Sequence, residues 1–341
     1  MIIFLFSTIL TIIIYFSIYN NRTKISLLLN VVDKPDLKRK IHKNPTPKTA
    51  AFSIALSLFA FLIINLFGNF IDSDFNLVLI GSILVFFVGY LDDRYRLSPL
   101  KKIIFISLIS FFVFILSDNL IINKFYIYTF DFFFELKNFS LIFSILCILC
   151  LVNSLNLADG INGLATGLIF FWLFFINQLY GSGFYYFDNN LNILNNIILI
   201  NLILIFIHNY KGDHFLGDSG SLMLSSFLGF SLIYLYNKNI NLPNNQNNAE
   251  IIMILFIFPI LDMIRLFFER LLNKKSPYAG DNRHLHHYLI KRFSIKKTLI
   301  IYFLTLNLPI ILAFYTAISK VMIILLIILI YIFSVFFYKR P

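Results

Sequence analysis

Charged residues are scarce in this chain. Only 13% of its 341 residues are Asp, Glu, Lys or Arg, whereas about 25% are charged in an ordinary soluble domain. Hydrophobic residues make up 59% of the chain, and its mean hydropathy is +0.83. This composition excludes a soluble globular enzyme, a disordered chain and a coiled coil. It leaves a membrane protein that crosses the bilayer several times.

Cysteine is nearly absent as well, with two residues in the whole chain. Cys147 and Cys150 have CxxC spacing, which can serve redox chemistry or metal binding, but both fall in the apolar run FSILCILCLVNSL. Reactive thiolates need electropositive, partly exposed surroundings. We therefore interpret both as small residues packed in a membrane span.

Long apolar runs fill most of the sequence. One helical crossing needs ~20 mainly apolar residues, and the first segment lacks the basic start and cleavage site of a signal peptide. We expect spans near 1–20, 50–67, 76–91, 103–116, 139–155, 164–179, 193–207, 221–236, 251–272, 298–318 and 321–337. The sequence thus predicts an all-α polytopic integral membrane protein with about eleven transmembrane helices, or ten, in one domain (1–341). The segment INKFYIYTFDFFFEL is rich in strand formers and predicts a small hairpin.

The basic residues predict the orientation. With the N-terminus outside, 24 of the 28 Lys and Arg residues lie on the cytoplasmic side, as the positive-inside rule requires. The C-terminus is then cytoplasmic. The predicted cytoplasmic loops lie near 21–48, 92–102, 156–163, 208–220 and 272–297. The same topology places all six histidines on that side: His42, His208, His214, His284, His286 and His287. A protein that served only as a membrane anchor would not require histidines on one side, so we expect a functional site that faces the cytoplasm.

Four cytoplasmic segments carry polar residues suited to catalysis. They are GYLDDRYRLSPLKK with Asp92 and Asp93, NSLNLADGINGLATG with Asn156, Asp159 and Asn162, HNYKGDHFLGDSGSLMLSS with Asp218, and KKSPYAGDNRHLHHYLIKR. Carboxylates that converge near hydrocarbon are costly and repel one another unless a cation lies among them. Mg²⁺ suits such a site, because it takes one or two carboxylates and leaves other positions to water and phosphates; Mn²⁺ is the alternative metal.

Glycines flank two of these aspartates. Gly160, Gly217 and Gly220 allow a close approach of backbone to a phosphate. GDSGS also opens a helix, whose first N–H groups favour an anion. We therefore expect these glycines and Ser219 close to a phosphate.

The histidine motif HLHH favours a polar ligand over zinc. In a helix, His284 and His287 would share a face, with His286 turned away. Zn²⁺ needs three or four N or S ligands, and no cysteine is near. We expect these histidines and Arg283 to contact a sugar or diphosphate; capping by Asp281 and Arg283 is the competing interpretation. Asp262, Arg265 and Glu269 have the i, i+3, i+7 spacing of a structural ion-pair ladder.

Taken in this order, the four motifs resemble the polyprenyl-phosphate N-acetylhexosamine-1-phosphate transferases, glycosyltransferase family 4. The resemblance runs from VDKPDLKRKIHKNPTP to HLHHYLI. It implies that a UDP-N-acetylhexosamine gives its sugar 1-phosphate to undecaprenyl phosphate, which releases UMP and requires Mg²⁺. It further implies a bacterial inner-membrane enzyme that starts cell-envelope glycan synthesis, such as lipopolysaccharide, and it leaves a homodimer open. No nucleic acid is expected as a partner.

The resemblance also assigns roles to residues. It implies that Asp218 is a metal ligand, that Asp159 is a carboxylate near the diphosphate and metal, and that one of Asp92 and Asp93 is the base towards the lipid phosphate. It implies contacts to the nucleotide or sugar from a larger set: Asn156, Asn162, Asn209, Arg283, His284, His286 and His287. The HxHH form favours N-acetylglucosamine as the sugar.

The chain departs from the family pattern at several positions. Asn162 and Arg96 stand where the family often has acids, Ala50 and Ala51 replace a Gly-Gly pair, and KGDH replaces Pro-Ala-Lys. These changes leave another UDP-N-acetylhexosamine open as donor. A transporter or flippase, a membrane prenyltransferase and an inactive scaffold are the alternatives outside this reaction. A transporter predicts acids at mid-span and two related halves, and a prenyltransferase needs a second aspartate-rich motif.

Overall fold

The computed structural model describes residues 2–35, 44–68, 72–181, 189–240, 249–277 and 282–339. His42 and Asp281 therefore lie outside the described residues. The described chain forms thirteen α-helices: α1 (Ile2–Asn20), α2 (Arg22–Leu29), α3 (Ala50–Gly68), α4 (Ser73–Tyr95), α5 (Pro99–Ile115), α6 (Ser140–Ala158), α7 (Leu164–Gly181), α8 (Asn189–Lys211), α9 (Gly217–Asn239), α10 (Ala249–Leu272), α11 (Leu285–Arg292), α12 (Ile295–Tyr315) and α13 (Lys320–Lys339). It also forms two antiparallel strand pairs: β1 (Val32–Asp33) with β2 (Thr46–Pro47), and β3 (Lys124–Ile127) with β4 (Phe132–Glu135).

Each of the eleven predicted apolar runs forms a helix, and only α2 and α11 fall outside them. Eight helical segments are long and apolar enough to cross a membrane, and α1 and α7 contain shorter apolar segments. The all-helical, multi-span fold class is therefore confirmed. The count of eleven crossings and the orientation stay predictions. The hairpin expected in INKFYIYTFDFFFEL is confirmed as β3 and β4.

Helix α9 lies at the centre of the bundle. The apolar segment of this helix is buried along its whole length, as expected of a helix that packs on all sides. Its main neighbours are α4 and α6. A Cβ atom on Gly89 of α4 would lie 2.4 Å from the Cα atom of Ser219, so only glycine at this position lets the two backbones approach so closely.

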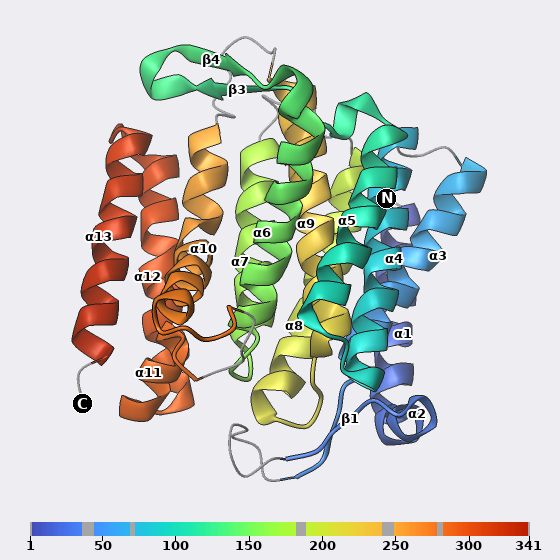
Figure 1. Cartoon of the computed structure of the whole chain (residues 1–341). Coiled ribbons are helices and arrows are strands. Elements are labelled where there is room, and N and C mark those ends of the chain that lie inside the picture. Colours follow the sequence, from blue (N-terminus) through green and yellow to red (C-terminus); the bar gives the residue numbers. More distant parts are fainter. Residues whose placement is uncertain are drawn as a thin grey trace.

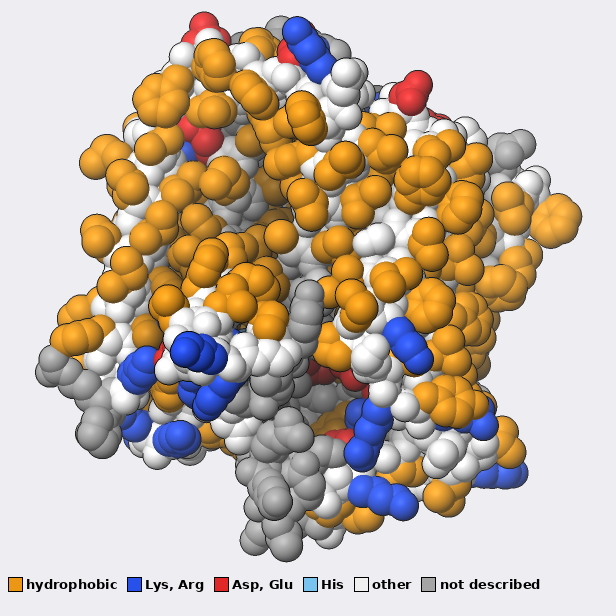
Figure 2. Space-filling model, in the orientation of Figure 1, with side chains coloured by type: hydrophobic (Ala, Val, Ile, Leu, Met, Phe, Trp, Pro, Cys, Tyr) orange, Lys and Arg blue, Asp and Glu red, His pale blue; other side chains and the backbone are white. Residues whose placement is uncertain are grey.

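The loops that the sequence predicts to be cytoplasmic gather at one end of the bundle. β1, α2, α11 and the last turn of α13 lie at this end, and the β3–β4 hairpin lies at the other (Figure 1). Lys and Arg side chains concentrate at the first end, while apolar side chains cover the sides of the bundle (Figure 2). Many of these lateral side chains are strongly exposed, such as Leu304, Leu329 and Phe333, each 63% exposed or more. An apolar belt of this kind is the surface that a polytopic membrane protein turns to lipid.

Candidate active site

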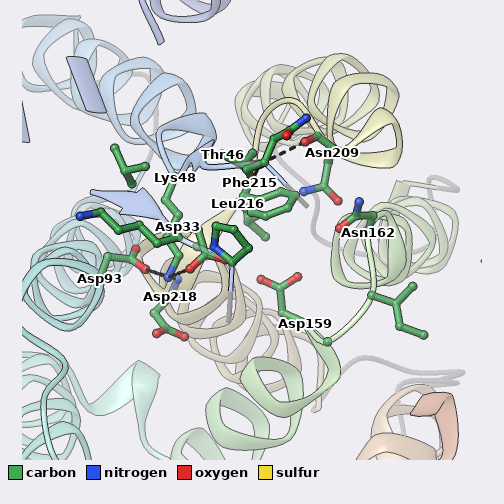
Figure 3. Close-up of a pocket in the computed structure, with 18 of the residues that line it drawn as sticks. Asp33, Thr46, Lys48, Asp93, Asp159, Asn162, Asn209, Phe215, Leu216 and Asp218 are labelled. Carbon is green, nitrogen blue, oxygen red and sulfur yellow. Dashed lines mark hydrogen bonds and ion pairs between the residues drawn. The ribbon is translucent and has the colours of Figure 1, made fainter. Parts of the chain in front are cut away.

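A cavity of about 930 Å³ opens at the end of the bundle where the basic residues gather. It lies between the ends of α4, α8 and α9, the loop after α6 and the β1–β2 segment. Acidic side chains are visible inside a hollow at this end (Figure 2). In the close-up, Asp33, Asp93 and Lys48 lie on one side of the pocket, with Asn162 and Asn209 on the other (Figure 3). Nine of the predicted site residues line it: Asp92, Asp93, Asp159, Gly160, Asn162, Asn209, Gly217, Asp218 and His287.

Asp93 of α4 caps the N-terminus of α9. Its carboxylate accepts hydrogen bonds from the backbone N–H groups of Asp218 (3.1 Å) and Ser219 (2.9 Å), and its side chain has no exposed surface. Gly217 has a φ of +73°, and a Cβ atom there would lie 2.6 Å from the Asp93 carboxylate. The expectation that these first N–H groups receive a substrate phosphate is therefore corrected, because the anion at this helix end is the side chain of Asp93.

Lys48 binds the other side of the same carboxylate. Its ammonium lies 3.1 Å from Asp93 and 3.7 Å from Asp33. Burial opposes the positive charge of Lys48, but the nearby carboxylates of Asp93, Asp218 and Asp33 outweigh this and raise its pKa. Lys48 is thus a fixed cation among several anions.

A backbone pairing delivers Lys48 to the pocket. The segment that precedes α3 lies beside the segment that precedes α9: the N–H of Phe215 donates to the carbonyl of Pro47 (2.9 Å), and the N–H of Ala50 donates to the carbonyl of Phe215 (3.2 Å). On the far side, the side chains of His214 and Thr49 are 2.9 Å apart and buried. The sequence neighbours of Lys48 therefore hold it against α9.

The carboxylates of Asp92 and Asp218 come from two helices, α4 and α9. Asp92 of α4 is 5% exposed and forms an ion pair of 2.7 Å with Lys102 of α5. Asp218 of α9 accepts a hydrogen bond of 3.1 Å from the side-chain amide of Asn156 on α6. Asn156 is thus placed behind the metal-ligand candidate and not among the residues that line the cavity.

Asp159 follows the last residue of α6 and faces the cavity (Figure 3). Burial, together with the negative charges of Asp218 and Asp93, raises its pKa to about 7, although Lys48 acts in the opposite direction. The positive charge of Lys48 therefore does not offset the burial of the Asp159 carboxyl group and the negative charges around it. A cation bound beside it would relieve both the repulsion and the burial of charge.

These donors fit a magnesium ion that is completed by substrate and water. The described residues contain no group of three or more His, Cys, Asp or Glu side chains arranged to hold a metal on their own. Mg²⁺ does not need one, since it is held by one or two carboxylates plus waters and phosphate oxygens. Asp218 and Asp159 supply two carboxylates in one cavity, whereas Asp93 and Asp92 are already paired with Lys48 and Lys102.

The opposite wall of the cavity is formed by amides. Asn162 lines it and faces Gly212, whose hypothetical Cβ would lie 3.1 Å from the Asn162 amide nitrogen. Asn209 lines the wall but has two backbone partners: it accepts from the N–H of Gly163 and donates to the carbonyl of His214. Its amide ties the loop after α6 to the loop before α9, so its contact to a nucleotide stays a prediction.

The histidine motif does not present one face to the cavity. His284 precedes the first residue of α11, and its Nδ1 lies 2.8 Å from the carboxylate of Asp262. His286 is 1% exposed, and neither ring nitrogen has a hydrogen-bond partner in the described part of the chain. Burial, with His287 and His284 close by, lowers its pKa well below the ordinary value. Its Nε2 lies directly behind Gly160, 2.4 Å from where a Cβ would be.

Of the three histidines, His287 alone reaches the cavity. The spacing argument was right that His286 is turned away from the cavity but wrong that His284 shares the face of His287, because α11 begins one residue after His284 and the His284 ring bonds Asp262 instead. Arg283 lies 3.5 Å from Glu269 of α10. The ladder prediction is confirmed, because Arg265 binds both Asp262 and Glu269 at 2.9 Å.

Sequence reasoning did not single out Lys48, Lys102 or Asp33. All three lie in juxtamembrane segments whose charges served as topology signals. Lys102 comes ten residues after Asp92, across the turn between α4 and α5. A lysine that follows an aspartate pair across such a short turn is a signal that could have identified it.

The fold and the cavity together define a polytopic membrane protein with an acidic, lysine-containing pocket at one end of its helices. The sequence model of glycosyl transferase family 4 matches residues 75–236. This range contains α4 to α9 almost completely, with Asp92, Asp93, Asp159 and Asp218. Over this range the chain is similar to glycosyl transferase family 4, the family that its motifs predicted.

Curated relatives extend the similarity over most of the chain. A probable undecaprenyl-phosphate N-acetylglucosaminyl 1-phosphate transferase of Bacillus subtilis (strain 168) is 28% identical over 78% of this chain and 72% of its own length. The undecaprenyl-phosphate alpha-N-acetylglucosaminyl 1-phosphate transferase of Yersinia pestis is 28% identical over 79% and 72%. The protein of the same description from Thermotoga maritima is 25% identical over 79% and 76%.

Proposed function

We propose that this protein transfers N-acetylglucosamine 1-phosphate from UDP-N-acetylglucosamine to undecaprenyl phosphate, giving a lipid-diphosphate sugar and UMP. One observation carries the proposal. Five aspartates, from α4, α9, β1 and the loop after α6, line a single cavity at the end of a membrane bundle, in a chain similar to three proteins whose names describe undecaprenyl-phosphate N-acetylglucosaminyl 1-phosphate transferases, one of them as probable.

The position of the cavity suits the two substrates. The acceptor is a phosphate anchored in lipid, and the donor is soluble in water, so their phosphates meet only at the membrane surface. The cavity lies at the helix ends, where lipid and water are both within reach. Transfer between two anions depends on positioning and on neutralisation of charge, and Lys48 and Lys102 supply fixed positive charge there.

Asp218 and Asp159 would hold Mg²⁺, with Mn²⁺ as the alternative. When bound, the metal neutralises the diphosphate of the donor. Asn156 fixes the Asp218 carboxylate by a hydrogen bond, which orients one oxygen and leaves the other available.

The two members of the aspartate pair receive different roles. Asp93 is held by two backbone N–H groups and Lys48, so its proposed role is to position α9 and Asp218. Asp92 lines the cavity, where it is paired with Lys102 and also contacts the carboxyl group of Asp218. We assign to Asp92 the role of base towards the lipid phosphate, with Lys102 orienting the incoming anion.

The amide wall is proposed as the nucleotide side. The side chain of Asn162 accepts the N3–H of uracil, and Phe215 offers a ring in the same wall. His287 is assigned to the sugar or diphosphate. The space left by the two glycines is taken by protein side chains, His286 at Gly160 and Asp93 at Gly217, so their role is to admit these side chains. His286 then supports the loop after α6 from behind Gly160, and Asn209 ties that loop to the one before α9. His284 and Arg283 are held by Asp262 and Glu269 of α10.

This activity implies a multi-pass protein of a bacterial cytoplasmic membrane and an initiating step of cell-envelope glycan synthesis. Another UDP-N-acetylhexosamine is the runner-up donor, since Asn162 and Arg96 differ from the family pattern. A lipid or ion transporter is the alternative of another class. It places its site near the bilayer midplane between related halves, whereas these carboxylates lie at helix ends.

A donor panel tests the proposal. Purified protein in detergent receives undecaprenyl phosphate, Mg²⁺ and one radiolabelled UDP-sugar at a time, and the lipid phase is counted. We expect label in lipid from UDP-N-acetylglucosamine. Label from a different N-acetylhexosamine alone would replace the sugar but keep the reaction, and no label from any donor with folded protein would reject the reaction.

A further inference from the structure

The hairpin of β3 and β4 exposes phenylalanine side chains on both of its faces. Phe132, Phe133 and Phe134 are consecutive in β4 and are 51%, 50% and 50% exposed, and Phe130 in the turn is 66% exposed. Successive strand residues point to opposite faces, so Phe133 lies on one face and its two neighbours on the other. An antiparallel surface pair usually has one apolar face on the core and one polar face in water. In this hairpin one face is wholly apolar, with Phe125, Ile127, Phe132 and Phe134, while Phe133 shares the other face with Tyr126 and the Lys124–Glu135 pair and is still half exposed.

The hairpin is attached to the bundle along β3. The backbone N–H of Tyr126 donates to the hydroxyl of Tyr236 on α9 (2.9 Å), and that hydroxyl lies 3.3 Å from the carbonyl of Lys124. In the turn, the N–H of Thr129 donates to the buried carboxylate of Glu250 on α10 (3.3 Å). These bonds hold β3 on the helix ends, while every residue of β4 is exposed.

The hairpin also lies where the apolar belt of the bundle ends. It extends across the end opposite the cavity (Figure 1). Three helix ends on that side carry strongly exposed apolar residues: Phe67 at 89%, Leu116 at 66% and Tyr315 at 71%. The hairpin surface therefore continues the surface that the bundle turns to lipid.

We propose that the β3–β4 hairpin docks into the interfacial layer of the bilayer, with rings from both faces among headgroups and the first part of the acyl chains. The apolar face needs an apolar cover, the exposed Phe133 ring adds to it from the mixed face, and the apolar belt that the hairpin continues identifies lipid as that cover. The free edge of β4 would be unsatisfied in the hydrocarbon core, so the interface is the depth that fits. Aromatic rings concentrate at that depth.

The polar residues of the hairpin are placed for the same depth. Lys124 and Glu135 are directly opposite at the open end of the two strands. Asp131 lies in the turn and accepts a hydrogen bond of 2.7 Å from the hydroxyl of Tyr126. Charges at both ends and rings between them match the amphipathic headgroup layer rather than hydrocarbon or water.

Tryptophan fluorescence tests this proposal on each face separately. Phe132→Trp and Phe133→Trp are placed in nanodiscs whose lipids carry bromine near the glycerol end of the acyl chain, which quenches nearby rings. The one native tryptophan, Trp172, is 1% exposed, so the parent chain supplies the background. Leu325→Trp on the lipid-facing side of α13 and Lys275→Trp at the cavity end are the lipid and water controls.

Both hairpin reporters are expected to emit at shorter wavelength than the Lys275→Trp control, to lose most of their signal in brominated lipid, and to resist aqueous acrylamide. Quenching of both by acrylamide alone places the hairpin in water and overturns the proposal. Lipid quenching at one position only overturns the two-faced arrangement. Protection of a position from both quenchers indicates a protein or a second copy on that face, which also overturns it.

Discussion

At the scale of single residues, the cavity contains charges that are buried in pairs, and two carboxylates that are not. Asp93 and Asp92 each have a lysine partner, while Asp218 has an amide and Asp159 has a raised pKa. This division separates residues that hold the site together from residues that are available to bind. Substitutions of the two kinds are expected to have different effects.

Asp218→Asn is expected to remove turnover and keep the fold. The change keeps the size of the side chain and its contact to Asn156 but deletes the charge that would hold the metal. Loss of one such electrostatic group typically costs about 10²–10³-fold in kcat. The measurement is the rate of UMP release beside the melting temperature, with Asp118→Asn at the opposite end as control. Near-normal turnover would contradict the assignment of Asp218 as a metal ligand.

Asp93→Asn is expected to destabilise the protein as well as slow it. The substitution leaves Lys48 without its main partner and removes the anion at the N-terminus of α9. Breaking a buried ion pair from one side costs about 3–5 kcal/mol, and the low end applies because Lys48 is 22% exposed. In Asp93→Asn/Lys48→Met the loss of thermal stability should be smaller than in Asp93→Asn. A double variant that is as unstable as the sum of both single variants contradicts a direct pair.

His214 gives the protein a pH dependence with a defined sign. Burial, with Arg22 nearby, lowers its pKa to about 3, although Asp213 acts in the opposite direction; the unfolded value is about 6.5. Between these values the unfolded chain binds a proton that the folded chain does not, so stability falls as pH drops below about 6.5, by up to about 1.4 kcal/mol per pH unit. Between pH 7.5 and pH 5, the melting temperature of the His214→Gln variant should fall by less than that of the wild-type protein. Equal losses would contradict the prediction.

At the scale of elements, the contact between α4 and α9 sets the geometry of the site. Both aspartates of the pair lie at the end of α4, and Asp218 lies in the first turn of α9. Gly89 permits the close approach of these backbones, since a Cβ there would lie 2.5 Å from the carbonyl oxygen of Asp218. Any side chain at this position must push the two helices apart.

Gly89→Ala is therefore expected to reduce both stability and turnover. Overpacking a close contact typically costs about 1–3 kcal/mol, and here the shift also moves Asp218 relative to Asp93. Leu84→Ala, on an exposed part of the same helix (46%), is the matched control and should keep turnover. Melting temperature and UMP release report the two effects. A Gly89→Ala variant with wild-type values for both would show that α4 and α9 can separate without cost.

Helices were predictable from the sequence because apolar composition is a local property, and each apolar run supplied its own signal. The positions of Asp92, Asp159 and Asp218 near one another followed from topology, since all lie at span ends on one side. The cap that Asp93 makes on α9 was not predictable, because it depends on how two distant helices pack. The contact of His284 with Asp262 was missed for the same reason, because it depends on how the start of α11 packs against α10.

At the scale of the whole molecule, the basic side chains and the candidate active site lie at the same end of the bundle. The cavity and most of the visible Lys and Arg side chains lie there, and the aromatic hairpin lies at the other end (Figures 1 and 2). A protein built in this way exposes its reactive groups to one aqueous compartment and to the lipid of one leaflet. This asymmetry suits a reaction that joins a soluble donor to a lipid acceptor.

The most direct test is UMP release by the purified protein under four conditions: complete, without undecaprenyl phosphate, without Mg²⁺, and without both. The complete mixture contains UDP-N-acetylglucosamine. The account predicts UMP only in the complete mixture, and its restoration when Mg²⁺ is added back after chelation. UMP that appears without the lipid acceptor would indicate simple hydrolysis, and full activity in chelator would contradict a magnesium site at Asp218 and Asp159.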